Sequence, residues 1–274
     1  MCSLAPITLS DSHCHLDFDV FNNDRQDVIN RARENGIDRI LNPGINIETS
    51  KAAIKWAEAF PEVYAAIGIH PNDATSWNET TLDELRSLAR SPKVVAIGEI
   101  GLDYYRNRAP KDLQQHILSL QLDLATELGL PIIVHNRDAW SDMLMMLGDW
   151  YSRLIDKSEV LLNNPGVLHS FSGELDNAYK VISINFRIGI TGPVTFHKSV
   201  TLQSMVSSLP LEYLLIETDA PFLTPHPYRG RRNEPAYVRK VAEKIAELKN
   251  QTLETITEIT SAGADQLFHW REIH

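Results

Sequence analysis

The chain has 274 residues, of which 43% are hydrophobic and 23% are charged, and its formal net charge is −10. This composition is typical of a globular protein, and the acidic balance argues against a broad basic surface that grips nucleic acid along its length. No apolar stretch approaches the roughly 20 residues of a membrane span, and no secretion signal or disulfide framework is apparent, since Cys2 and Cys14 are the two cysteines. We expect a cytoplasmic protein without membrane association and infer no obligate protein partner.

Short apolar runs along the chain are predicted to be strands, beginning with residues 7–9. Their spacing is close to the length of one βα unit, roughly 30 residues. The runs end near His15, Leu41, His70, Glu99, His135, His169, Thr191 and Asp219. Segments of helical period lie between the runs, most clearly over residues 111–128, and others follow Asp24, Glu48, Thr81, Glu174 and Pro235. Residues 141–165 are predicted to form a helix followed by a surface loop.

Strands that alternate with helices, without a linker, predict an α/β fold of the (β/α)8 TIM-barrel type, in one domain over residues 1–274. An open doubly wound sheet is the alternative. It is disfavoured because the first βα turn has no glycine-rich phosphate loop, and because polar residues end many strands rather than two neighbouring ones. A barrel brings the carboxyl ends of all its strands to one face.

The segment DSHCH at residues 11–15 is the most informative motif. On an extended chain His13 and His15 point to the same side and Cys14 points away, which makes the two imidazoles a ready pair of metal ligands. One such histidine is more often bound to a backbone carbonyl in a core. Four further ligand-type residues nevertheless end separate apolar runs, and they are Glu99, His135, His169 and Asp219. Six such residues at matching strand ends predict a metal centre.

Four imidazole nitrogens and two carboxylates are too many ligands for one tetrahedral zinc and suit two divalent ions (Mg, Mn or Zn). Glu99 has two oxygens and is expected to bridge the ions, with His13 and His15 on one ion and His135 and His169 on the other. Two ions about 3.5–4 Å apart share and activate a hydroxide. Asp219 is expected to be a ligand that also accepts the proton of the attacking water, so Glu99 and Asp219 are the predicted catalytic residues.

Basic and aromatic residues that follow the predicted strand ends suggest a phosphate-containing substrate. Three arginines lie within residues 229–232, after the eighth strand, where barrels often bind phosphate. The simpler interpretation is a solvated charge cluster, and for the histidine after the third strand it is ordinary packing. The predicted substrate-binding residues are His70, Tyr104, Arg106, Arg137, Arg229, Arg231 and Arg232.

Seven motifs in order resemble the TatD family of metal-dependent deoxyribonucleases, within the amidohydrolase-like barrels. They are DSHCH at 11–15, GIHP at 68–71, GEIGLDY at 98–104, HNRDA at 135–139, HSFSG at 169–173, ETDAP at 217–221 and RGRRNEP at 229–235. The resemblance implies a barrel with a divalent-metal centre held by the six ligands named above. It also implies hydrolysis of DNA phosphodiester bonds, as a 3′ to 5′ exonuclease that prefers single strands.

Two features depart from the family pattern. Gly263 stands where the family often has asparagine, which predicts looser packing under the barrel, and residues 141–165 are longer than expected. Alternative functions also remain open. The same metal centre suits an amidohydrolase acting on a small ester, lactone or amide, or on an aminoacyl-tRNA ester. A metal-loaded scaffold without activity is disfavoured because no ligand position is lost.

Overall fold

The computed structural model describes residues 8–270, in which eight strands form one parallel sheet in sequential order. The strands are β1 (Leu9–Asp11), β2 (Ile37–Pro43), β3 (Val63–Ile67), β4 (Val94–Asp103), β5 (Ile132–Arg137), β6 (Gly166–Leu168), β7 (Arg187–Ile190) and β8 (Leu214–Ile216). All seven strand pairs are parallel, as crossover helices require. The predicted (β/α)8 barrel is confirmed, although Ile7 of the predicted first strand lies outside the described residues.

Backbone hydrogen bonds just beyond the ends of β1 and β8 bring these two strands together. Ser12 N donates to Ile216 O at 3.1 Å, and Asp219 N donates to His13 O at 2.9 Å. Cys14 and Ala220 then form an isolated parallel bridge. The sheet therefore closes at the position of two predicted metal ligands, which fixes His13 and Asp219 side by side.

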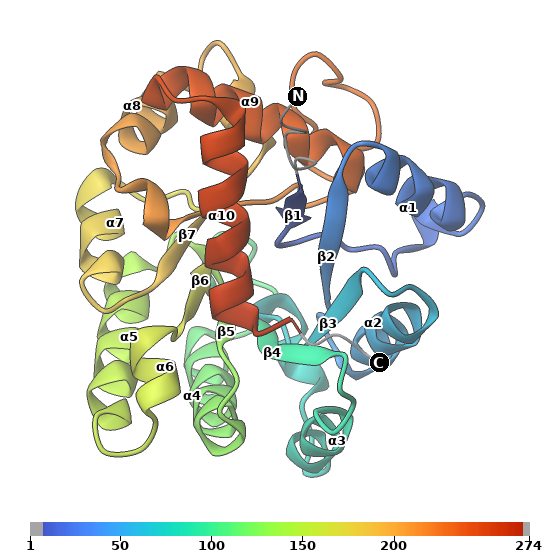
Figure 1. The fold of residues 1–274 in the computed structure, drawn as a ribbon. Coiled ribbons are helices and arrows are strands. Elements are labelled where there is room, and N and C mark those ends of the chain that lie inside the picture. Colours follow the sequence, from blue (N-terminus) through green and yellow to red (C-terminus); the bar gives the residue numbers. More distant parts are fainter. Residues whose placement is uncertain (1–7, 271–274) are drawn as a thin grey trace.

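Helices accompany the strands, and Figure 1 shows most of them in an outer ring around the sheet, with the last one crossing it. They are α1 (Arg25–Glu34), α2 (Ile47–Ala59), α3 (Thr81–Leu88), α4 (Lys111–Leu128), α5 (Trp140–Leu154), α6 (Glu159–Asn163), α7 (Leu175–Ile182), α8 (Val200–Ser208), α9 (Val238–Lys249) and α10 (Leu253–Phe268). Short 3₁₀ turns occupy η1 (Asp19–Phe21), η2 (Pro71–Ser76), η3 (Gly192–Thr195), η4 (Leu211–Tyr213) and η5 (Pro235–Tyr237). Among residues 8–270, no helix combines the length and the apolar character needed to cross a membrane.

The observed helices match the sequence pattern closely, with one correction. The helix predicted over residues 111–128 has those bounds as α4, and it ends at Gly129 with φ of 65°. The surface loop predicted near the end of 141–165 instead contains the short helix α6. Ser158 caps it, since its Oγ accepts a hydrogen bond from Leu161 N at 3.3 Å. Five residues give too short a periodic pattern to be detected in sequence.

The barrel interior and the strand–helix layer are two separate apolar clusters. The interior contains Leu41, Tyr64, Val95, Ile133, Val167 and Leu215. Leu267 and Phe268 of α10 pack against this interior set, and Figure 1 shows α10 crossing the sheet. The predicted metal ligands follow the carboxyl ends of the strands, so α10 closes the opposite end. This arrangement leaves the face that carries the ligands open for a substrate.

Gly263, on α10, does not loosen the packing as the family comparison suggested. Arg187 of β7 fills the space, because a Cβ atom at Gly263 would lie 3.0 Å from Arg187 Nη1. The buried guanidinium donates to Glu212 O at 2.5 Å and to Gln266 Oε1 at 2.8 Å. Because Gly263 has no side chain, the buried guanidinium of Arg187 has room to lie against α10.

Replacement of Trp150 by alanine is expected to lower the free energy of unfolding by about 3–5 kcal/mol, the usual cost of removing a buried tryptophan. Trp150 lies on α5, is 1% exposed, and donates through Nε1 to Thr126 Oγ1 at 2.8 Å. Its ring lies 6.2 Å from that of Phe186. Urea unfolding measures the change. Trp150→Phe keeps most of the side-chain volume, so its free energy of unfolding should fall clearly less than that of Trp150→Ala. Equal decreases in the two variants would contradict a cavity effect.

Candidate metal centre

The predicted ligands lie at one end of the barrel. Two of them belong to strands, and the others follow strand ends. Glu99 lies in β4 and His135 in β5, whereas His13, His169 and Asp219 follow β1, β6 and β8. Ile97 and Ile100 both pack in the apolar layer between the strands and the helices. Residues three apart normally face opposite sides of a strand. The β4–β5 register shifts between them, and this bulge gives Glu99 its direction toward the site.

One oxygen of Glu99 faces the ligands contributed by β1 and β8. Glu99 Oε2 lies 3.4 Å from His13 Nε2 and 3.6 Å from His15 Nε2, and the two nitrogens are 3.2 Å apart. Asp219 Oδ1 lies 3.7 Å from His15 Nε2. Cys14, between the two histidines, points away from them and is buried in the apolar layer between the strands and the helices. Ligand atoms of His13, His15 and Asp219 therefore lie within 4.8 Å of one another, a spacing that a single cation can span, and Glu99 Oε2 lies beside both histidine nitrogens.

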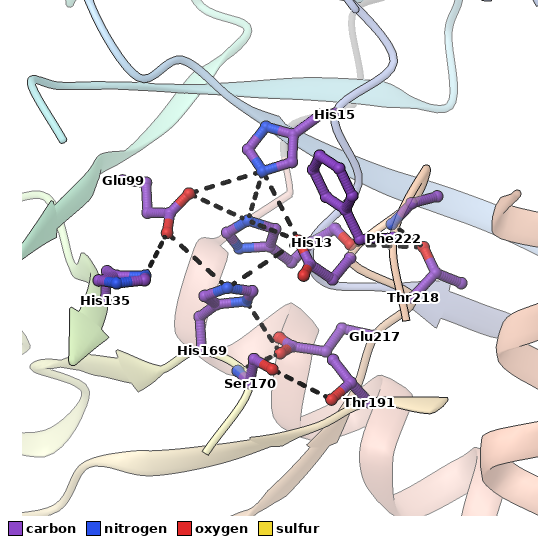
Figure 2. A network of polar contacts seen from close by, with 12 residues as sticks. His13, His15, Glu99, His135, His169, Ser170, Thr191, Glu217, Thr218 and Phe222 are labelled. Carbon is purple, nitrogen blue, oxygen red and sulfur yellow. Dashed lines mark hydrogen bonds and ion pairs between the residues drawn. The ribbon is translucent and has the colours of Figure 1, made fainter. Parts of the chain in front are cut away.

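The other oxygen of Glu99 faces the ligands contributed by β5 and β6. Glu99 Oε1 lies 3.0 Å from His135 Nδ1 and 3.7 Å from His169 Nε2. Figure 2 shows Glu99 between His135 on one side and His13 and His15 on the other. The carboxylate therefore has the position of a bridge between two groups of donors, as the sequence analysis predicted from its two oxygens.

Hydrogen bonds at the far side of two imidazoles assign their tautomers. His169 Nδ1 lies 3.0 Å from Glu217 Oε1, and His135 Nε2 lies 3.3 Å from Asp103 Oδ2. Because a carboxylate accepts, these nitrogens carry the hydrogen in the neutral rings. The lone pairs of His169 Nε2 and His135 Nδ1 are then directed at the centre, which is the state in which an imidazole binds a metal.

His70 also approaches Glu99, but its hydrogen bonds give it a different role. Its Nδ1 accepts from Asn72 N at 3.0 Å, so the neutral ring carries its hydrogen on Nε2. That nitrogen lies 3.5 Å from Glu99 Oε1. His70 is therefore oriented as a hydrogen-bond donor toward the carboxylate and not as a metal ligand.

The residues present fit a pair of divalent cations. Ligand atoms of His13, His15 and Asp219 lie within 4.8 Å of one another, and so do those of His13, Glu99 and His169. Such a concentration of acceptors is unfavourable unless a cation compensates for it. Mixed nitrogen and oxygen donors suit zinc or manganese, and the bridging carboxylate also suits magnesium.

The metal-free site is strongly coupled electrostatically. Burial alone would raise the pKa of Glu99, but the nearby His70 and His169 hold it well below its usual range. Burial would likewise lower the pKa of His169, and the carboxylates of Glu217 and Glu99 instead raise it to about 10. Burial raises the pKa of Asp219 to about 6 and lowers that of His15 to about 3. His169 must lose a proton before Nε2 can bind a cation.

A cavity of about 780 Å³ opens over these ligands and has a basic wall. Arg106, Arg108 and Arg137 line it, as do His70, Asn72 and Ser170. None of the three arginines forms an ion pair with an acidic side chain in the described part of the chain. Arg137 is held by stacking, with its guanidinium carbon 3.9 Å from the centroid of the Tyr105 ring. The acidic protein thus has unpaired positive charge at the mouth of the site.

The other predicted substrate-binding residues lie away from the cavity. Tyr104 donates to Asp142 Oδ2 at 2.6 Å and accepts from Gln115. Arg232 forms a two-pronged ion pair with Asp24, at 2.6 and 2.8 Å, and Arg229 stacks over Phe196 at 4.4 Å. Neither Arg231 nor these residues lines the cavity over the ligands.

Supporting residues escaped the sequence analysis even where they lay inside the quoted motifs. Asp103 and Glu217 contact His135 and His169, two of the predicted metal ligands, and fix the direction of their rings. Asp11, at the end of β1, holds the segment after β8 in place, since its two oxygens accept hydrogen bonds from Thr218 N at 2.8 Å and from Thr218 Oγ1 at 2.6 Å. Burial raises the pKa of Asp11 to about 8. The only sequence signal was position, because both Asp103 and Glu217 stand within four residues of a predicted ligand.

Comparison with known proteins agrees with this geometry. The sequence profile described as "TatD related DNase" matches residues 10–269. A relative from Bacillus subtilis, the uncharacterized metal-dependent hydrolase YabD, is 42% identical over 260 residues, which are 95% of this chain and 98% of that protein. The 3′-5′ ssDNA/RNA exonuclease TatD of Salmonella typhimurium is 37% identical over 255 residues, covering 90% and 94% of the two chains. The crystal structure of YjjV, a TatD homologue from Escherichia coli K12, superposes with a TM-score of 0.88 at 30% identity, over 97% of this chain and 99% of that one. The chain belongs to the TatD family of metal-dependent hydrolases.

Proposed function

We propose that this protein hydrolyses phosphodiester bonds in single-stranded nucleic acid, DNA in the first place, as a 3′ to 5′ exonuclease with two divalent ions. The observation that carries the proposal is the basic wall of Arg106, Arg108 and Arg137 beside the metal ligands. Guanidinium groups bind the charged oxygens of a phosphodiester through paired hydrogen bonds, whereas a neutral amide or lactone offers no negative charge to three of them. The name of the Salmonella relative supports the same substrate class.

Within this proposal each carboxylate has a distinct task. Divalent ions, when bound, polarise a phosphoryl oxygen and acidify water. The side chain of Asp219 is 14% exposed and that of Glu99 only 4%, so Asp219 is the carboxylate that water in the cavity can reach. Asp219 accepts the water proton as the new oxygen–phosphorus bond forms. The bond to the departing sugar oxygen breaks, and solvent protonates that oxygen. Glu99 holds the two groups of donors together.

End-labelled single-stranded DNA and RNA test the proposal directly. Purified protein is incubated with each strand in magnesium or manganese, with and without a chelator. The expected result is stepwise shortening from the 3′ end that requires metal. If protein shown to carry metal left both strands intact and cleaved small esters or lactones, the substrate class would be wrong and the amidohydrolase alternative would take its place.

Neutralising the basic wall is expected to weaken substrate use. Arg137→Met keeps much of the side-chain length but removes the charge, and kcat/KM for an oligonucleotide should fall about 10- to 100-fold, as expected for loss of a charged hydrogen bond. The salt dependence of KM should become shallower because one phosphate contact is lost. Arg153→Met is a suitable control, since Arg153 pairs with Asp123 on the outer surface. Equal activity of both variants would contradict the role of Arg137.

A further inference from the structure

A second cleft of about 710 Å³ adjoins the cavity over the metal ligands, and Phe18 and Phe222 line both. Val20 and Pro221 complete its apolar surface. Phe222 is 52% exposed, and Val20 is 50% exposed, so large apolar side chains remain uncovered next to the site. The two hollows are therefore separated by an aromatic wall that a bound molecule can touch from either side.

The aromatic wall is fixed to the metal centre. The Phe18 ring stacks on that of His15, with centroids 4.7 Å apart, and meets Phe222 edge to face at 6.0 Å. The backbone of Phe222 is held on both sides, since its N donates to Asp219 O at 2.8 Å and its O accepts from Asn233 Nδ2 at 2.6 Å. Figure 2 shows Phe222 among the residues around the site.

The charges that line the two hollows differ. The cavity over the ligands has unpaired arginines, whereas the second cleft has Asp17, Asp19 and one arginine, Arg232. Arg232 is already paired with Asp24. The second cleft therefore has no free cation for a phosphate, and its exposed aromatic ring suits a flat, uncharged group. Stacking of nucleobases on aromatic side chains is the common way in which single strands are held without sequence preference.

We propose that the second cleft is a nucleobase subsite, in which the base of a nucleotide adjoining the scissile phosphate stacks on Phe222. This inference rests on the proposed function and adds a specific contact to it. A strand whose phosphate lies at the metal centre would place its phosphates toward Arg106 and Arg137 and turn one neighbouring base across the wall into the cleft. Binding then depends on that base and not only on charge.

A cycle of enzyme variants and abasic substrates tests the contact. Wild type, Phe222→Ala and Phe222→Trp are assayed on a single-stranded oligonucleotide and on versions that lack one base at each of the last three positions. Phe222→Ala should lower kcat/KM for the intact strand about 5- to 150-fold, the range for loss of one base–aromatic stack. Phe222→Trp should retain most of the activity. Tyr179→Ala, which removes an exposed aromatic ring from α7, is the matched control.

The decisive result is the coupling between the two changes. Removing the base that occupies the cleft should slow the wild type by a similar factor and should have no further effect in Phe222→Ala. If the wild type cleaves the intact strand and neither the variant nor any single abasic position alters kcat/KM, the subsite is wrong while the proposed function stands. The subsite would also be wrong if the decreases in kcat/KM from Phe222→Ala and from removal of the base were additive. If metal-loaded wild type cleaves no oligonucleotide, the proposed function fails and the subsite with it.

Discussion

Asp219→Asn should abolish nearly all turnover while leaving the fold and most of the metal affinity intact. Asparagine has the same shape, so the backbone hydrogen bond from Asp219 N to His13 O persists. The amide cannot accept the water proton, and loss of a general base lowers kcat by roughly 10²–10⁴-fold. His13, His15 and Glu99 remain as ligands on that side of the centre. KM for a single-stranded oligonucleotide should change little.

The measurement is single-turnover cleavage by metal-loaded protein, with bound metal quantified in the same samples. Asp73→Asn provides the matched control, because Asp73 also lines the cavity but does not belong to any of the three groups of potential metal-binding residues among residues 8–270. It should retain most of its activity. Near wild-type kcat in Asp219→Asn would remove Asp219 from the catalytic role, and loss of metal in that variant would reduce its role to that of a ligand.

The fold, and the meeting of the predicted ligands at one end of it, are predictable from sequence for one physical reason. A parallel barrel needs an apolar run for each strand, and its function needs a polar residue at the carboxyl end of that run, so both signals recur at the same places. His13 and His15 are also predictable because alternation along an extended chain places both on one side. In the structure their Nε2 atoms are 3.2 Å apart.

The contacts that sequence could not give are those between distant segments. Arg232 was predicted to meet substrate with its two neighbouring arginines, but in the structure it pairs with Asp24, which is 208 positions away in the chain. The space above Gly263, on helix α10, is filled by Arg187 from strand β7. A charge run shows that cations are present, but which of them remain unpaired depends on tertiary contacts.

Glu99→Gln is expected to uncouple the two halves of the metal centre. In the structure one oxygen of Glu99 faces His13 and His15, and the other faces His135 and His169. A neutral glutamine has one carbonyl oxygen to offer and its amide nitrogen repels a cation. The half with His13, His15 and Asp219 keeps three ligands, whereas the half with His135 and His169 keeps two. We therefore expect two bound ions per wild-type chain and one in the variant.

Bound manganese after dialysis, measured by elemental analysis, gives the stoichiometry, and cleavage of single-stranded DNA gives the rate. Turnover should fall by roughly 10³-fold or more, since a two-ion mechanism loses both charge stabilisation and the geometry of the attacking water. Glu217→Gln is the graded comparison, because Glu217 accepts hydrogen bonds from His169 Nδ1, Ser170 N and Ser12 Oγ and so supports one of the predicted ligands from behind. Loss of such a supporting carboxylate typically costs about 10- to 100-fold in metal affinity or activity. A Glu99→Gln protein that retained two ions and wild-type turnover would mean that the bridge is not the feature that joins the two sites.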